Sequence, residues 1–248
     1  MSDQASKAIL ITGCSTGIGR ATALLLAKRG ADVAVNYSRS VKEAEATAEE
    51  IRALGRRALA VKADVANDAE VRAMVAEVAR ALGRLDILVN NAGFTHFIAF
   101  NELDKLTDDV WDRTMAVNVK GPFYCTRAAE PHMRKAGAGV VVNVSSMAGV
   151  LARGNSIPYC ASKAALNIVT RSLARTLAPE IRVNAVAPGV VRTRWVENQV
   201  SLVRAAQMQT PMRRVARPED VAQVIVSLIA DSDFVTGQII AVDGGLSA

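Results

Sequence analysis

The sequence has few aromatic side chains, few cysteines and few histidines. Of its 248 residues, 4% are aromatic, three are cysteine and two are histidine. The three cysteines, Cys14, Cys125 and Cys160, are odd in number and lack the spacing of metal ligands, so we expect neither a disulfide framework nor a metal site. A core with so few rings must be built from Ala, Val, Leu and Ile, which suits helices packed on a buried parallel sheet.

Long apolar runs are missing as well. Nowhere do about eighteen apolar residues follow one another, so the sequence predicts no transmembrane helix. Residues Met1–Lys7 lack a basic region followed by an apolar stretch, which disfavours a secretory leader and favours a cytoplasmic protein without a membrane partner. The formal net charge is +6, but the arginines are scattered and no aromatic side chains interleave them. Nucleic acid is therefore not expected as a partner.

Short β-branched or apolar runs alternate with longer helical patterns along the whole chain. This alternation predicts one α/β domain over residues 1–248, a Rossmann-type doubly wound parallel sheet of about seven strands with helices on both faces. The expected strands are 8–12, 33–37, 58–62, 87–90, 140–144, 182–187 and 238–242, and the expected helices are 18–29, 42–54, 69–82, 108–135 and 159–177.

The connection from Gly189 to Arg217 is longer than most loops and contains several apolar residues, among them Trp195, Leu202 and Met208. Segments of this length are usually functional, and this one is too apolar for a disordered linker. It predicts a partly helical substrate flap over about residues 190–216.

A glycine-rich loop, Thr12-Gly13-Cys14-Ser15-Thr16-Gly17-Ile18-Gly19, separates the first strand from the first helix. Glycine permits tight turns and close approach of the backbone to a pyrophosphate, whose charge the N-terminus of the following helix stabilises. The spacing is Gly-x-x-x-Gly-x-Gly rather than the commoner Gly-x-Gly-x-x-Gly. In this place in a βαβ unit, the loop predicts a dinucleotide site.

The second strand ends in Asn36-Tyr37-Ser38-Arg39-Ser40, without a carboxylate. An acid at this turn would hold the ribose hydroxyls of NAD(H), whereas Arg39 and Ser38 can donate to a 2′-phosphate. The sequence therefore favours NADP(H). If Arg39 is only a solvated loop residue or lies across the adenine ring, NAD(H) stays open as the alternative.

Tyr159 and Lys163 stand four residues apart in a helical pattern, so their side chains share one face. A neighbouring ammonium stabilises a phenolate and is expected to lower the pKa of the tyrosine. Ser146 follows the strand at 140–144, at the edge where ligands of open α/β sheets bind. Alone, a Tyr-x-x-x-Lys pair is more often a packed tyrosine beside a solvated lysine; the other motifs decide against that reading.

These motifs, in this order, resemble the classical short-chain dehydrogenase/reductases over essentially the whole chain, and the 3-oxoacyl-(acyl-carrier-protein) reductases among them. The resemblance implies a catalytic tetrad of Asn118, Ser146, Tyr159 and Lys163. It also implies the cofactor-binding residues Gly13, Ser15, Thr16, Gly17, Ile18, Gly19, Ser38, Arg39, Asp64, Val65, Asn91, Ala92, Gly93, Tyr159, Lys163, Pro188, Gly189, Val191 and Thr193.

The implied activity is reduction of a ketone to a secondary alcohol with NADP(H), with 3-oxoacyl thioesters among the candidate substrates. Ser146 and Tyr159 would bind the ketone oxygen, the nicotinamide would supply hydride, and Tyr159 would act as general acid/base. Lys163 would bind the nicotinamide ribose, and Asn118 would support a proton relay through a backbone kink and a water. A dehydrogenase of a sugar or another secondary alcohol, and a non-catalytic nucleotide-sensing protein, are the alternatives.

Apolar residues expected at the substrate site argue against a sugar and for an acyl or bulky ketone substrate; they are Phe94, Phe97, Met147, Leu151, Ile157 and Trp195. Arg134 and Lys135 could dock an acidic carrier protein, but Ala178-Pro179-Glu180 offers an acid where a basic contact would be more useful. The acyl carrier protein is thus a doubtful partner. The resemblance also implies a homotetramer.

Replacing Tyr159 with phenylalanine is expected to abolish turnover, because the variant has no hydroxyl proton to give to the substrate oxygen. Cofactor binding should be nearly unchanged, since the ring and its packing remain. Ketone-dependent oxidation of NADPH and a cofactor titration measure the two effects separately. Substantial reductase activity in Tyr159→Phe would remove the tyrosine from the role of acid.

Overall fold

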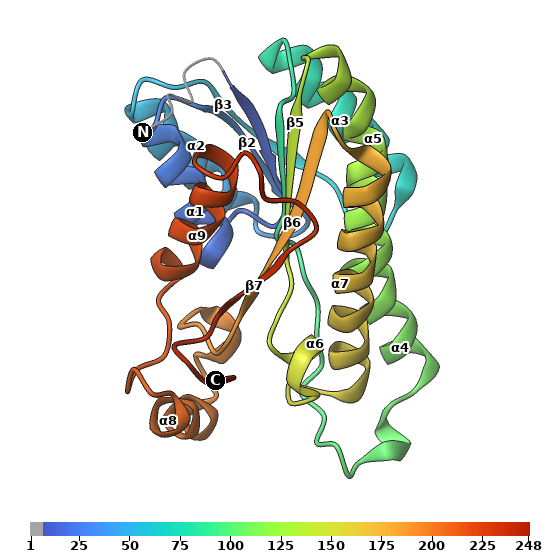
Figure 1. Cartoon of the computed structure of the whole chain (residues 1–248), viewed down its shortest axis with the longest axis vertical. Coiled ribbons are helices and arrows are strands. Elements are labelled where there is room, and N and C mark those ends of the chain that lie inside the picture. The colour runs from blue at the N-terminus through green and yellow to red at the C-terminus, as the bar shows by residue number, and fades with distance from the viewer. Residues whose placement is uncertain (1–6) are drawn as a thin grey trace.

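Seven parallel strands form one twisted sheet with helices on both sides (Figure 1). The computed structural model describes residues 7–248, so the expectation about a leader at residues 1–6 lies outside it. The strand order is β3-β2-β1-β4-β5-β6-β7. The strands are β1 (Ala8–Ile11), β2 (Asp32–Tyr37), β3 (Ala58–Lys62), β4 (Ile87–Asn90), β5 (Gly139–Val144), β6 (Ile181–Pro188) and β7 (Ile239–Val242). The predicted doubly wound sheet is confirmed.

Two helical layers cover the sheet. In Figure 1, α1 (Gly17–Lys28), α2 (Val41–Ala53) and α9 (Pro218–Ala230) lie on one face, and α3 (Asp68–Leu82), α5 (Gly121–Lys135) and α7 (Ile157–Leu177) lie on the other. The chain reverses its direction of winding between the neighbouring strands β1 and β4. In open α/β sheets this reversal opens a crevice at the carboxyl ends of the strands.

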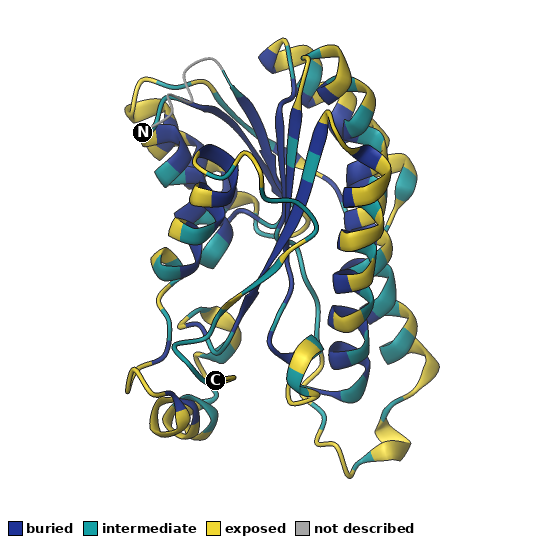
Figure 2. Cartoon of the chain, viewed as in Figure 1, coloured by how far each residue is buried: buried dark blue, intermediate teal, exposed yellow. Residues whose placement is uncertain are grey.

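The core is aliphatic, as the composition predicts. Figure 2 shows the central strands as buried, and Ile9, Leu10 and Leu88 are completely inaccessible. Within residues 7–248, Tyr159 is the one aromatic side chain among the buried hydrophobic residues. The burial of Tyr159 is therefore not part of a general packing of aromatic side chains in the core.

The structure contains a helix that the sequence analysis missed. Helix α9 begins with Pro218, and the Arg217 N–H donates to Asp220 at 2.7 Å in a capping arrangement. Proline in the first turn and an acid at the third position are both helix-start signals, and Val221, Ile225 and Ile229 repeat at helical spacing on its buried face. The sequence therefore contains local signals for this helix.

Two predicted helices also have different bounds. The region 108–135 is divided into α4 (Asp108–Met115), a π-helical turn (Ala116–Lys120) and α5. Helix α7 begins at Ile157, two residues before the predicted start, because Ser156 caps it by accepting the N–H of Tyr159. Between β6 and α9 the chain forms a short 3₁₀ turn (Arg194–Val196) and α8 (Val200–Gln209), and a short α6 (Ala148–Leu151) follows β5. No helix within residues 7–248 has both the length and the apolar composition of a bilayer span.

A buried chain of polar side chains ties helix α7 to the sheet. Asn90 of β4 donates to the Asn143 Oδ1 of β5 at 2.9 Å, and Asn143 Nδ2 donates to Thr170 Oγ1 of α7 at 2.9 Å. All three residues are at most 2% exposed. Since buried polar groups must be paired, this chain fixes how α7 sits on the two strands.

Replacing Asn143 with alanine should lower the free energy of unfolding by about 1–3 kcal/mol, because Asn90 and Thr170 would each lose a buried partner. Urea denaturation measures the change. The matched control is Asn101→Ala at an exposed turn, which should stay within about 0.5 kcal/mol of the parent chain. Equal effects of the two substitutions would show that the buried chain does not hold α7.

Candidate active site

A cavity of about 650 Å³ opens at the carboxyl edge of the strands, in the crevice where the winding reverses. Residues from the turns after β1 to β6 line it, together with α7 and the segment around the 3₁₀ turn. The cavity brings together every predicted cofactor and catalytic residue except Gly19 and Asn118. Gly19 and Asn118 are buried and do not line the cavity.

The glycine loop is packed tightly against the turn after β4. Gly13 has φ of +59°, and a Cβ there would stand 2.8 Å from the backbone of Ala92. A Cβ at Gly19 would stand 2.6 Å from Asn91 Nδ2. Thr12 Oγ1 accepts the N–H groups of Asn91 and Ala92 at 3.0 Å each. Only glycine permits this approach, so Gly19 acts through packing and does not face the cavity.

The start of α1 is suited to an anion. Thr16, at the N-cap, makes no side-chain capping bond in the described structure, so the first-turn N–H groups of α1 are not satisfied by that side chain. Gly17 carries no side chain over them, and a Cβ there would meet Thr193 at 3.2 Å. Free N–H donors and the positive end of the helix dipole match the needs of a pyrophosphate.

Beyond the glycine loop, the cavity wall carries cations and hydroxyl groups. Ser38 and Arg39 line it after β2, and no acid accompanies them there. Asp64 lines it after β3, with one carboxylate oxygen accepting the Ala66 N–H and the other paired with Arg113 at 2.9 Å. This end of the cavity therefore fits the phosphorylated adenosine half of a dinucleotide.

At the other end, Ser146, Tyr159 and Lys163 share the cavity wall. Lys163 Nζ donates to the Val144 carbonyl at 2.8 Å and lies 5.7 Å from the centre of the Tyr159 ring. Ser146 Oγ accepts the N–H of Ala148 at 3.1 Å. The phenol, the ammonium and the serine hydroxyl are thus held at one place by β5, its following turn and α7.

Asn118 lies in the π-helical turn between α4 and α5. Its Oδ1 accepts the Phe94 N–H at 2.8 Å, and its Nδ2 donates to Phe94 O and to Ser162 Oγ at 2.9 Å each. Within the described residues, the side chain therefore links the turn after β4 to α7 and makes no hydrogen bond to Lys163. The local π-helical distortion fits the predicted backbone kink, and such turns are frequent at functional sites.

Comparison with known proteins assigns the family. A family model described as enoyl-(acyl carrier protein) reductase matches residues 13–247. The crystal structure of a short-chain type dehydrogenase/reductase from Mycobacterium marinum matches 99% of this chain and 97% of its own with a TM-score of 0.93 and 35% identity. The chain belongs to the short-chain dehydrogenase/reductase family.

Two named relatives of this short-chain dehydrogenase/reductase are similar over nearly their full length. FabG of Staphylococcus aureus, a 3-oxoacyl-(acyl-carrier-protein) reductase, is 40% identical over 97% of this chain and 98% of its own. A short-chain dehydrogenase from Burkholderia cenocepacia, crystallised in complex with NADP, is 37% identical, covers 99% of this chain and 100% of its own, and has a TM-score of 0.92.

The pKa of Tyr159 differs from the sequence-based expectation that Lys163 would lower it. Burial raises the pKa of Tyr159 to about 12, and hydrogen bonding with Ser146 opposes that shift without cancelling it. Burial also lowers the pKa of Lys163 to about 8. The expectation that Lys163 would leave the tyrosine pKa below its ordinary value was wrong for this structure, because both groups are removed from water and each is held toward its neutral form.

Sequence reasoning placed several substrate-side residues correctly and missed others. Phe94, Met147, Leu151 and Trp195 line the cavity, whereas Phe97 and Ile157 do not. Arg153 and Arg194 also line it, in the same segments as the expected apolar residues, but neither arginine was singled out. No motif marks them, because both are surface-like arginines in irregular segments that only the fold brings to the cavity.

Replacing Lys163 with methionine should change how stability depends on pH. The folded state disfavours the charged lysine, so between about pH 8 and the ordinary lysine value of 10.5 the unfolded chain binds more protons and stability rises with pH. The variant loses this rise, which amounts to roughly 3 kcal/mol over the window. Its stability relative to the parent should therefore be highest near neutral pH and decline as pH rises.

Urea unfolding at several pH values measures that difference. Lys62→Met, at the exposed end of β3, is the matched control and should show no such slope. A pH-independent difference between Lys163→Met and the parent chain would mean that the folded lysine titrates at its ordinary value.

Proposed function

We propose that this short-chain dehydrogenase/reductase is an NADP(H)-dependent oxidoreductase that reduces a ketone to a secondary alcohol. The observation that carries the proposal is the wall shared by Ser146, Tyr159 and Lys163 at one end of a cavity whose other end is suited to a phosphorylated dinucleotide. The names of the relatives support it, since FabG is a 3-oxoacyl reductase and the Burkholderia cenocepacia structure contains NADP.

Ser146 and Tyr159 have different roles at the carbonyl group of the substrate. The hydroxyls of Ser146 and Tyr159 bind and orient the ketone oxygen, and Tyr159 then donates its proton to that oxygen. A pKa of about 12 keeps the free tyrosine protonated at neutral pH, in the form that an acid needs. NADPH, when bound, supplies the hydride.

Lys163 supports the tyrosine. With a pKa of about 8 it is mostly protonated near neutral pH, and the charge beside the ring stabilises the phenolate that forms as the proton leaves. Its bond to Val144 uses one N–H and leaves others for the ribose hydroxyls of the cofactor. Asn118 acts from behind this wall by positioning the Phe94 backbone and α7.

The lining of the cavity supports the following proposed roles for the cofactor residues. The glycine loop and the start of α1 bind the pyrophosphate, Ser38 and Arg39 the 2′-phosphate, and Asp64 with Val65 the adenine. Residues 91–93 and the segment Pro188, Gly189, Val191 and Thr193 flank the nicotinamide half. Residues 190–216 form a flap over the substrate within a single domain of residues 1–248; the 3₁₀ turn and α8 support this assignment.

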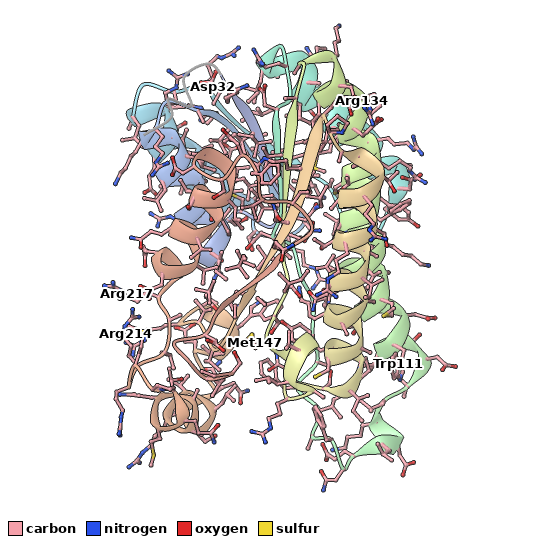
Figure 3. The ribbon with its side chains drawn as sticks, in the orientation of Figure 1. Asp32, Trp111, Arg134, Met147, Arg214 and Arg217 are labelled. Atoms are coloured by element: carbon pink, nitrogen blue, oxygen red, sulfur yellow. The ribbon has the colours of Figure 1, made fainter. Side chains whose placement is uncertain are left out.

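Docking of an acyl carrier protein through Arg134 is not favoured. Arg134 is already paired with Glu130 and, at 2.9 Å, with Glu180. Figure 3 also places Arg134 at the opposite end of the sheet from Met147, which lines the cavity. We therefore propose a free ketone or a small acyl thioester as the substrate.

We also infer a cytoplasmic homotetramer. Apolar side chains exposed on two helices and after α9 support an assembly surface, namely Phe123 on α5, Ile168 on α7 and the fully exposed Phe234. The three cysteines are free thiols in the described structure, which suits a reducing compartment.

A panel of ketones, β-keto thioesters and enoyl thioesters, each assayed with NADPH and NADH, tests the reaction class. Reduction of the keto compounds with NADPH is expected, because two hydroxyls converge on one oxygen. Turnover of the enoyl thioesters alone would contradict ketone reduction.

Replacing Arg39 with glutamine should lower the ratio of kcat/KM for NADPH to kcat/KM for NADH by roughly tenfold, because one charged hydrogen bond to the 2′-phosphate is lost. Arg153→Gln is the matched control: Arg153 lines the same cavity beside Gly154 and Asn155, away from the end of β2, and should leave the ratio unchanged. An unchanged ratio in Arg39→Gln would assign the phosphate to other residues.

A further inference from the structure

The indole of Trp195 stands at the reacting end of the cavity. Its ring packs edge-on against Tyr159, with ring centres 6.2 Å apart and planes at 65°. Its Cη2 atom lies 3.3 Å from the position that a Cβ on Gly93 would occupy. The indole thus spans from the turn after β4 to the phenol of α7, and the missing side chain of Gly93 makes room for it.

The segment that carries Trp195 contacts α2 and the start of α1 at the cofactor half of the cavity. The preceding residue, Arg194, pairs with Glu43 of α2 at 3.0 Å, and Thr193 packs over Gly17. The Val196 N–H donates to the Thr193 carbonyl at 3.0 Å and closes the 3₁₀ turn. These contacts hold the segment against the start of α1 and against α2, and the ring contact with Tyr159 places the indole.

One part of this indole is still open. Trp195 is 43% exposed and lines the same cavity as Ser146 and Tyr159, so part of its surface is available to a group bound there. Met147, Leu151 and Leu202 line the same cavity. An apolar group attached near the carbonyl would be removed from water against these side chains, and a polar or very small group would gain nothing there.

We propose that Trp195 is a specificity-determining residue that binds the larger, apolar substituent of the ketone. This inference rests on the proposed ketone reduction and adds the substrate class: ketones with a flat or bulky apolar group close to the carbonyl. Aromatic groups benefit further, because rings pack favourably against an indole.

Two ketones that differ only by a phenyl group test the proposal. Butanone and benzylacetone share the same methyl ketone, and benzylacetone adds a phenyl ring at the far carbon. In the parent enzyme with NADPH, kcat/KM should be higher for benzylacetone. In Trp195→Ala the ratio of the two kcat/KM values should fall by about tenfold or more, mainly through a higher KM for benzylacetone.

Variants at and near the site separate specificity from folding. Trp195→Phe keeps an aromatic wall and should retain most of the preference. Met208→Ala is the matched control, because Met208 is an exposed apolar residue on α8 of the same flap and does not line the cavity. Its ratio should equal that of the parent.

Fluorescence provides a readout without turnover. The chain has two tryptophans, so in a Trp111→Phe background the emission reports Trp195. In the complex with NADP⁺, where a ketone cannot be reduced, benzylacetone should protect Trp195 from acrylamide quenching and butanone should not.

The possible failures are distinguishable. A parent enzyme that reduces neither ketone nor any other with NADPH would overturn the proposed function and this inference with it. A parent enzyme that reduces ketones, combined with an unchanged ratio in Trp195→Ala or no protection by benzylacetone, would overturn the role of Trp195 alone.

Discussion

The site depends on the burial of one lysine against the end of one strand. Lys163 Nζ donates to the Val144 carbonyl at 2.8 Å, and this bond holds α7 at the carboxyl end of β5. The side chain is only 3% exposed, so its position is decided by packing and not by solvent. A Cβ on Gly149 of α6 would stand 2.5 Å from the Lys163 backbone, which shows how closely the neighbouring turn approaches the same point. Tyr159, one helical turn earlier, is positioned as a consequence.

The two ends of the cavity are built in different ways. The proposed cofactor end uses a local motif, in which consecutive residues of one loop and the first turn of α1 form the proposed anion site. The reacting end is assembled from distant segments: the turn after β4, the π-helical turn with Asn118, the turn after β5, and α7. Buried side-chain bonds join them, including Asn118 to Phe94 and Asn143 to Thr170. Chemistry at the carbonyl therefore depends on the whole fold, whereas phosphate binding depends mainly on one βα unit.

Burial also decides the electrostatics of the proposed acid. A lysine beside a tyrosine in water would favour the phenolate, but in this structure burial raises the pKa of Tyr159 and the free tyrosine stays neutral. In the proposed reaction, Tyr159 gives up its proton only when negative charge develops on the substrate oxygen. The ammonium of Lys163 then stabilises the phenolate that forms. A high resting pKa is compatible with an acid that acts during hydride transfer.

The sequence by itself determined the parallel sheet, the glycine loop and the acid-free end of β2, and its motifs led to the proposed tetrad, because each is encoded in local spacing or in a motif of neighbouring residues. Even α9 had local signals at Pro218 and Asp220 that could have been read. Only the tertiary structure decided that Gly19 and Asn118 lie behind the cavity wall, that Trp195 meets Gly93 and Tyr159, and that burial raises the tyrosine pKa. Those properties depend on how closely distant segments approach one another and exclude water, which side-chain spacing along the chain does not specify.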